Sequence, residues 1–340
     1  MTKTFIFLIF ILVSTSSIVA QSLKGIVLDQ KTNLPIESAA VYFDGTTIGT
    51  STNASGEFKI DIVEGVTAPL IISFMGYQKT IIPEYNASKF YRILLTEDLN
   101  VLDEIVISAD DGMSKAEKLK QFRREFLGSS ENGKACKILN ESDLILRFNS
   151  DKKQLTASAR QPIVVQNNNL EYLISFDIQD FVIDYSYADV LKNHFRVRSV
   201  IYFGTTFYTD QDTLNTKRTI KKRDKAYEGS HLHFIRALYN KQLTEEGYKI
   251  FDGSFEVPPY KFISIDTIEN SKNLKISLEK KLTILYDKKR QSMIQVNGDY
   301  FVIDQYGNYA PIDTVLFGGD LGKQRIGDAL PFDYNLSSYR

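Results

Sequence analysis

Apolar and polar residues alternate over short stretches between residues 22 and 96. Alternation with a period of two is typical of strands that bury one face, and turn-forming clusters such as 52–56 separate the stretches. No helical period runs through this part of the chain, so the pattern predicts a small seven-stranded antiparallel β-sandwich over residues 22–96. The predicted strands are 23–28, 39–43, 46–51, 57–62, 69–74, 79–82 and 91–95.

The pattern changes after the predicted sandwich, where apolar residues recur at helical spacing. Phe122 and Phe126 share one face of a helix predicted over 115–127, with Ser114 as its N-cap and Gly128 as its stop. Further strand-like runs follow, which predicts a second β-rich region. These runs are 144–148, 154–159, 163–166, 170–176, 181–185, 195–208 (two strands bent at Gly204), 261–265, 274–278, 281–286, 300–303 and 315–317.

A second helical segment interrupts these strands. Asp224 is its candidate N-cap, and Tyr227, Phe234, Ile235 and Leu238 form an apolar stripe. The predicted fold is therefore mainly β, with the seven-stranded antiparallel β-sandwich followed by a β-rich α+β domain that carries two helical segments. The predicted division is a signal peptide at 1–20, the sandwich at 22–96, a linker at 97–113 and the β-rich C-terminal domain at 114–334.

The first twenty residues have a pattern of their own. Lys3 is their only charged residue, 5–13 is an unbroken apolar run, and the small residue Ala20 precedes Gln21. This order is typical of a secretory signal peptide, and the apolar run is shorter than the stretch of about 20 residues that spans a bilayer. We therefore predict export, with cleavage after Ala20.

Composition narrows the chemistry. The chain has 340 residues with 41 Lys+Arg against 42 Asp+Glu, so no net field attracts nucleic acid. Its one cysteine, Cys136, cannot form an internal disulfide and is predicted to be a buried small hydrophobe. His231 and His233 would point about 200° apart on a helix, which predicts one buried and one surface histidine rather than a metal pair. We predict no metal and no cofactor.

Catalytic motifs are absent from the sequence. It contains no His-Glu-x-x-His, Gly-x-Ser-x-Gly or P-loop pattern. The alternative to a non-enzymatic protein is a hydrolase with a carboxylate-based site in the C-terminal domain, because paired carboxylates can cut a glycosidic bond. The candidate acids for that alternative are Asp177, Asp180, Asp184 and Asp189.

Several runs in the predicted sandwich carry a resemblance. They are Gly25-Ile26-Val27-Leu28-Asp29, Leu34-Pro35-Ile36, Ala39-Ala40-Val41, Gly49-Thr50-Ser51-Thr52-Asn53, Gly56-Glu57-Phe58 and Phe74-Met75-Gly76-Tyr77. With these runs the segment resembles the carboxypeptidase-regulatory-like domain of Bacteroidetes envelope proteins, found also at the N-terminus of TonB-dependent receptors. The resemblance implies a transthyretin-like sandwich in the periplasm or at the outer membrane. It implies no carboxypeptidase activity.

The segment after the sandwich is open to two interpretations. Residues 94–109 resemble the segment that joins the same sandwich to the plug of TonB-dependent receptors. Alternatively, 101–109 is a strand that completes the sandwich or pairs with the next domain.

A basic run lies next to the second helical segment. It consists of Lys217, Arg218, Lys221, Lys222, Arg223 and Lys225. One interpretation is the solvated start of a helix, and the other is contact with an anionic surface or partner through Lys217, Arg218, Lys221, Lys222 and Arg223. The run has no interleaved aromatic residue, so nucleic acid is not expected.

Together these patterns predict a non-enzymatic exported protein of the cell envelope. We expect a protein- or glycan-binding accessory module associated with the outer membrane, compatible with peripheral membrane association. Its partner would be an envelope protein or a glycan.

Overall fold

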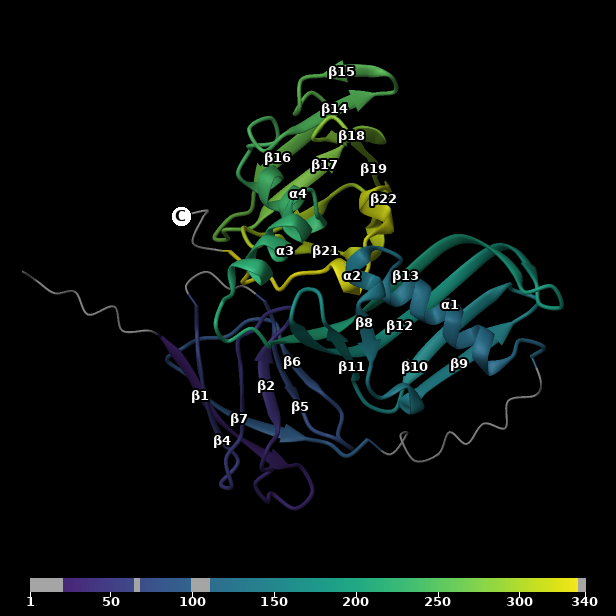
Figure 1. Ribbon diagram of the computed structural model, residues 1–340. Helices are drawn as coiled ribbons and strands as arrows, with labels where there is room; N and C mark the ends of the chain where they lie inside the picture. Colours follow the sequence, from purple (N-terminus) through teal and green to yellow (C-terminus); the bar gives the residue numbers. More distant parts are fainter. Residues whose placement is uncertain (1–20, 64–67, 99–110, 336–340) are drawn as a thin grey trace, which may run out of the picture.

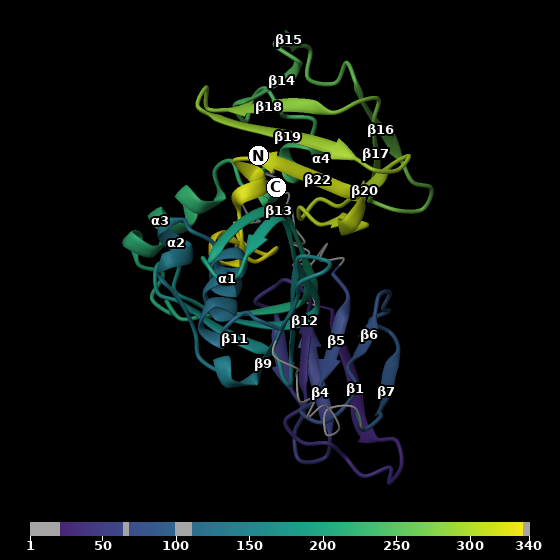
Figure 2. The same ribbon diagram turned by 90° about the vertical axis from the view of Figure 1, so that its right-hand side faces the viewer.

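The computed structural model describes residues 21–63, 68–98 and 111–335 of the chain. The predicted signal peptide and most of the predicted linker, including 101–109, lie outside the described residues. The described residues form a mainly β structure with three groups of sheets, which Figures 1 and 2 show as three parts meeting near the middle of the molecule.

The N-terminal sandwich contains the seven predicted strands. One sheet has the order β4-β1-β7 and the other β3-β2-β5-β6, and buried side chains of both sheets form one hydrophobic cluster. The strands are β1 (Ser22–Asp29), β2 (Ala40–Phe43), β3 (Gly49–Ser51), β4 (Glu57–Asp61), β5 (Leu70–Ser73), β6 (Thr80–Ile82) and β7 (Phe90–Leu95).

The pairing of this sandwich differs from the prediction at one place. Strand β7 lies parallel to β1, with Lys24 opposite Phe90 and Asp29 opposite Leu95, whereas the other described pairs are antiparallel. The prediction of an entirely antiparallel sandwich is therefore wrong here. The physical reason is that the chain leaves one sheet after β6 and crosses to the other, so that β7 enters beside β1 in the same direction.

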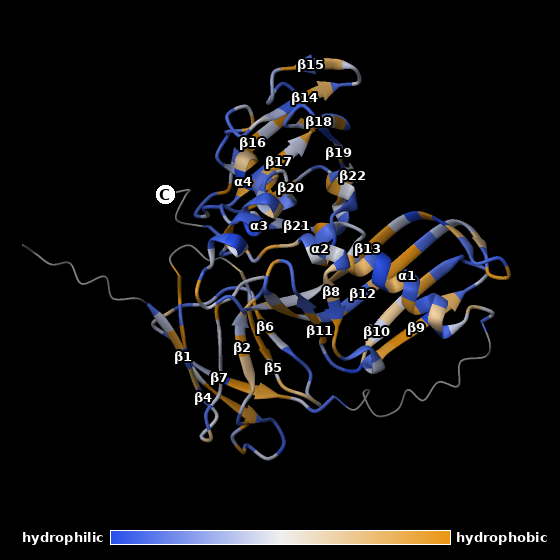
Figure 3. Cartoon of the chain, viewed as in Figure 1, coloured by the Kyte–Doolittle hydropathy of each residue, from blue (hydrophilic) through white to orange (hydrophobic). Residues whose placement is uncertain are grey.

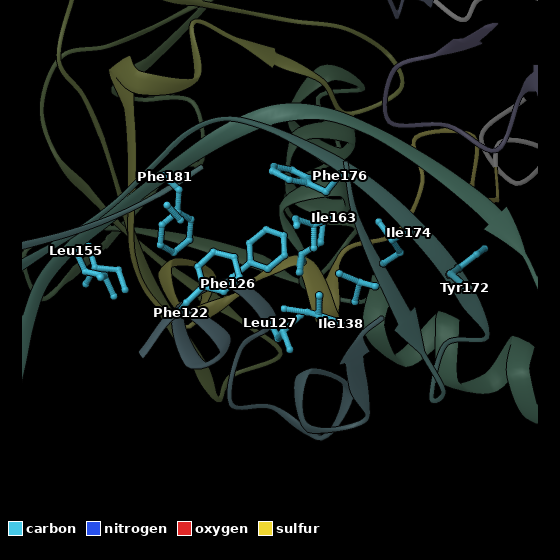
Figure 4. Close-up of a cluster of buried hydrophobic side chains, with 14 of the residues drawn as sticks. Phe122, Phe126, Leu127, Ile138, Leu155, Ile163, Tyr172, Ile174, Phe176 and Phe181 are labelled. Carbon is cyan, nitrogen blue, oxygen red and sulfur yellow. The ribbon is translucent and has the colours of Figure 1, made fainter. Parts of the chain in front are cut away.

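The second group is a curved sheet of the order β8-β11-β12-β10-β9, with β13 paired to β12. Helix α1 packs into its curve through Phe122 and Phe126, which contact Phe176 and Phe181 of the sheet (Figure 4). The elements are α1 (Lys115–Leu127), α2 (Glu131–Lys134), β8 (Cys136–Ile138), β9 (Leu144–Asn149), β10 (Gln154–Ala159), β11 (Ile163–Asn167), β12 (Tyr172–Asp189) and β13 (His194–Asp210), with a 3₁₀ turn at Glu141–Asp143.

Strands β12 and β13 are longer than predicted. The expected break at Gly204 is wrong, because β13 runs through it without interruption. Gly204 instead lies against β12 where the register shifts between Ile178 and Asp180, and a side chain there would meet the Asp177 carbonyl oxygen at 2.1 Å. The glycine therefore permits close strand contact at a bulge.

The third group consists of two further sheets with α4 packed against both. Their orders are β15-β14-β18-β19-β22 and β16-β17-β20-β21, around a hydrophobic cluster of their own. The strands are β14 (Tyr248–Asp252), β15 (Phe255–Val257), β16 (Ile263–Thr267), β17 (Leu274–Leu278), β18 (Leu282–Tyr286), β19 (Arg290–Val296), β20 (Phe301–Ile303), β21 (Tyr309–Ala310) and β22 (Val315–Gly319), with 3₁₀ turns η3 (Ile312–Thr314), η4 (Leu321–Lys323) and η5 (Ile326–Asp328).

The second helical segment is two helices rather than one. Helix α3 (Lys217–Tyr227) is capped by Thr216, and α4 (His231–Tyr239) by Ser230. Asp224, the expected cap, lies inside α3. Gly229 separates the helices with a φ of 68°, a backbone conformation that glycine adopts without strain. Figure 3 shows α3 as predominantly hydrophilic, in agreement with its basic sequence.

The sandwich is attached to the β12–β13 hairpin by backbone hydrogen bonds. Gly45 N–H donates to the Thr206 carbonyl at 2.7 Å, and Tyr208 N–H donates to the Thr46 carbonyl at 3.0 Å. Thr206 N–H also donates to the Asp44 carboxylate at 2.6 Å. The joint between the two parts is thus a short piece of β-structure with a carboxylate inside it.

The C-terminal segment of the described chain ties all three groups together. Arg236 of α4 is fully buried, and its guanidinium donates to the carbonyls of Tyr306, Phe332 and Tyr334 at 2.9–3.0 Å. Phe332 N–H in turn donates to the Gly45 carbonyl of the sandwich at 2.7 Å. One buried cation therefore holds a segment that also contacts the first domain.

The joint should respond to pH through Asp44. Burial raises the pKa of Asp44 to about 6, although the N–H groups of Thr206 and Gly45 and the nearby Lys79 act in the opposite direction. Because the folded chain holds this proton more tightly than the unfolded chain, Asp44 lowers the free energy of unfolding as pH rises from about 4 to about 6. Its contribution to that fall is on the order of 2–3 kcal/mol.

Asp44→Asn, which stays neutral, should lack this fall. Urea unfolding of wild type and variant at several pH values would measure it, and the stability difference should shift in favour of the variant as pH rises. A difference that is constant between pH 4 and pH 7 would contradict the assignment.

Candidate functional site

The basic run divides into three groups of side chains that face different surroundings. Arg223 points inward and is 4% exposed. It pairs with both carboxylate oxygens of Asp210 at 2.7 and 2.8 Å, donates to the carbonyls of Leu170 and Glu171, and lies 3.8 Å over the ring of Tyr172. Its position fixes α3 to the curved sheet, so Arg223 does not share a surface with the rest of the run.

The other members of the run lie on the outside of α3. Lys217, Arg218 and Lys221 are exposed, and their side chains make no hydrogen bond or ion pair to another described residue. Lys222 and Lys225 instead line a pocket. The helix therefore presents one solvated basic group and one basic group directed to a cavity.

This pocket has a volume of about 450 Å³ and lies where the curved sheet meets the third group of elements. Helices α2 and α3 and the 3₁₀ turns η4 and η5 contribute its walls. The lining residues are Ser129, Ser130, Glu131, Asn132, Asn169, Lys222, Lys225, Ala226, Arg290, Asp320, Lys323, Gln324 and Asp328. With one exception, Ala226, these residues have polar or charged side chains, and none is aromatic.

One wall is a chain of hydrogen bonds. The Asn169 amide donates to the side-chain oxygen of Asn132. The Asn132 amide nitrogen in turn donates to the Asp328 carboxylate at 3.1 Å. The Ser130 hydroxyl donates to the same Asp328 oxygen at 2.7 Å. Three segments distant in sequence thereby hold one another in a fixed arrangement.

The facing wall is held by Arg290 and Gln324. The Arg290 guanidinium lies 4.5 Å over the Tyr286 ring and 3.9 Å from Asp320. Gln324 donates to the Gly229 carbonyl at 3.1 Å and accepts from His231 N–H at 3.1 Å. Both side chains position the wall, and Gln324 connects it to the start of α4.

Charges around the pocket do not balance locally. Lys225 pairs with Glu131 at 3.6 Å, and Arg290 lies opposite Asp320. The ammonium groups of Lys222 and Lys323 make no ion pair or hydrogen bond to another described residue. Two ammonium groups at this pocket are therefore free to bind a ligand.

The histidines and the cysteine have structural environments. His233 is buried and contacts the Glu246 carboxylate at 2.9 Å, and burial lowers its pKa. The other histidine, expected on the surface, is half-buried: His231 packs edge-on against Phe317 at 4.5 Å, and burial lowers its pKa to about 4. Burial likewise raises the pKa of the half-buried Cys136 thiol to about 12, which disfavours the nucleophilic thiolate.

The candidate acids of the hydrolase alternative are spread along β12 rather than gathered. Asp177 pairs with Lys79 of the sandwich at 2.7 Å, and Asp184 lies 3.3 Å from Arg198. At about 3.3 Å per residue, the stretch from Asp177 to Asp189 extends about 40 Å. Within the described ranges, no group of three or more His, Cys, Asp or Glu side chains is arranged to hold a metal ion.

Comparison with known proteins identifies the first domain. Residues 23–107 match the family model of the CarboxypepD_reg-like domain, which confirms the resemblance found in the sequence and extends it into the predicted linker. The N-terminal region is 35% identical over 86 residues to the TonB-dependent receptor SusC of Bacteroides thetaiotaomicron. That match covers 25% of this chain and only 8% of the receptor.

Two solved structures show weaker similarity. A type II cohesin–X-dockerin complex from Acetivibrio cellulolyticus aligns with 31% of this chain and 74% of its own, at 20% identity and a TM-score of 0.21. A provisionally described carbohydrate-binding protein from Bacteroides uniformis aligns with 88% of this chain and 98% of its own, at 10% identity and a TM-score of 0.18. In the part of the chain that the structure describes, no helix is long and apolar enough to cross a membrane.

Sequence patterns pointed to the basic run but not to the pocket. Lys222 was a candidate, whereas Lys323, Arg290 and Asn169 lie in separate segments with no common motif. The one signal near them was the spacing of charges on α3, and it could not distinguish an inward arginine from an outward lysine.

Replacing Arg223 and Lys221 in turn should distinguish the buried arginine that anchors α3 from an exposed lysine of the same helix. Arg223→Met removes a buried cation and leaves Asp210 and two carbonyls without their donor, so we expect a loss of about 2–3 kcal/mol in the free energy of unfolding. Lys221→Met, on the exposed side of the same helix, should change it by less than about 0.5 kcal/mol. Urea denaturation compares the two, and equal stabilities would show that Arg223 does not anchor α3.

Proposed function

We infer that this chain is a non-enzymatic accessory or binding module of the cell envelope, exported and associated with the outer membrane or periplasm, that engages an envelope protein or a glycan. The observation that carries the inference is the match of its N-terminal region to that of a TonB-dependent receptor, over a domain of the same family. A domain shared with an outer-membrane receptor supports a location and an assembly role rather than a reaction.

Support for a protein partner comes from the sandwich. It exposes several large apolar side chains although it is already attached to the β12–β13 hairpin. These are Leu34, Met75, Ile81, Phe90 and Leu94. Apolar side chains left in solvent on a folded domain favour protein contact, and strand β7, which carries Phe90 and Leu94, is an edge of its sheet among the residues that the structure describes.

Support for a glycan comes from the pocket between α2, α3, η4 and η5. Its amide, hydroxyl and charged lining offers donors and acceptors for hydroxyl groups, and its walls are held by their own hydrogen bonds. The proposed export rests on the N-terminal signal pattern, with Gln21 as the first residue of the mature chain.

Cross-linking mass spectrometry on intact envelopes tests this function. The protein should appear in envelope fractions with Gln21 at its N-terminus, and lysines of the sandwich, such as Lys24 and Lys59, should cross-link reproducibly to one envelope protein or glycan-bearing component. A cytoplasmic marker protein serves as the fractionation control. Recovery of the protein with the cytoplasmic marker, or with no reproducible neighbour, would contradict the function.

A further inference from the structure

We propose that the pocket between α2, α3, η4 and η5 binds a saccharide that carries one carboxylate, of the uronic-acid class. The proposal deepens the glycan-binding part of the proposed function and rests on it. The argument begins with charge, because the pocket holds ammonium groups that the protein itself does not neutralise.

The charge of the lining favours a monoanion. Four cationic side chains face three carboxylates, so the pocket has an excess of one positive charge. Lys225 and Arg290 are opposite Glu131 and Asp320, and Asp328 accepts hydrogen bonds from the neighbouring wall. The excess therefore resides on Lys222 and Lys323, whose ammonium groups make no ion pair or hydrogen bond to another described residue. A carboxylate that reaches these ammonium groups would form charge-assisted hydrogen bonds.

A phosphate ester fits this lining less well. At neutral pH a phosphate monoester carries nearly two negative charges. The pocket offers an excess of only one, and three carboxylates of the lining would repel the second charge. A single carboxylate on an otherwise neutral ligand would neutralise the one excess positive charge of the lining.

The hydroxyl groups of a sugar would pair with the remaining polar side chains of the pocket. The Ser129 hydroxyl and the side-chain carbonyl of Asn169 make no hydrogen bond to another described residue, so they are open to a ligand. The lining has no aromatic side chain on which a neutral sugar ring could stack, so recognition depends on hydrogen bonds and charge. A volume of about 450 Å³ is within the range of small-molecule sites.

The pocket is also built in advance. Asn132 uses both ends of its amide to hold Asn169 and Asp328, and Gln324 uses both ends of its own to hold Gly229 and His231. A ligand would meet amide side chains that are already ordered at Asn132 and Gln324, which reduces the entropic cost of binding them.

An NMR titration of the protein as exported tests the proposal with galacturonate, galactose and inorganic phosphate as probes. Galacturonate and galactose differ only in the carboxylate at one carbon, so they form a matched pair. We expect saturable binding of galacturonate with shifts confined to the pocket, no measurable binding of galactose, and weakening as salt is added. Failure of galacturonate to bind, equal binding of galactose, or displacement of galacturonate by equimolar phosphate would overturn the proposal.

Lysine variants localise the binding. Lys222→Met and Lys323→Met should each weaken galacturonate binding about tenfold. Lys221→Met, one position away on the exposed face of α3, should leave it unchanged, and equal thermal midpoints would show that all three variants fold. Unchanged affinity in both pocket variants would place any binding elsewhere. If galacturonate does not bind but cross-linking still finds an envelope partner, only the pocket assignment fails.

Discussion

The guanidinium of Arg236 is the point on which the arrangement of the three parts depends. It is fully buried, and a buried charge is costly unless its hydrogen bonds are satisfied. Three backbone carbonyls satisfy it, one from the loop before β21 and two from the C-terminal segment. Because these carbonyls come from two separate segments, the need to solvate one cation helps to fix the course of the C-terminal segment.

That segment then connects parts that share no strand. Phe332 hydrogen-bonds to Gly45 of the sandwich, Asp333 accepts from Thr47, and the Tyr334 hydroxyl donates to Asp224 of α3 at 2.7 Å. The same segment follows η5, whose Asp328 belongs to one wall of the pocket. The pocket is therefore a product of how the sheets are held together. None of the sheets contains it alone.

Local patterns predicted much of the fold. Alternation located the seven strands of the sandwich, because each strand buries one face and solvates the other. Ser114 and Gly128 correctly bounded α1, where the cap accepts from Glu117 N–H. The apolar stripe from Tyr227 to Leu238 predicts one helix capped at Asp224, whereas the backbone at Gly229 divides this segment between the end of α3 and α4. The direction of β7 could not be predicted, because alternation carries no information on which way a strand runs beside its neighbour.

The sequence alone determined the identity of the first domain, the positions of its strands and the concentration of positive charge on one segment, because these depend on residues close together in the chain. Tertiary structure decided what that charge does. Arg223 and Lys222 are neighbours of similar chemistry, yet one is 4% exposed against Asp210 and the other lines the pocket. Helical geometry turns successive side chains by about 100°, and only packing against the sheet determines which of them is buried.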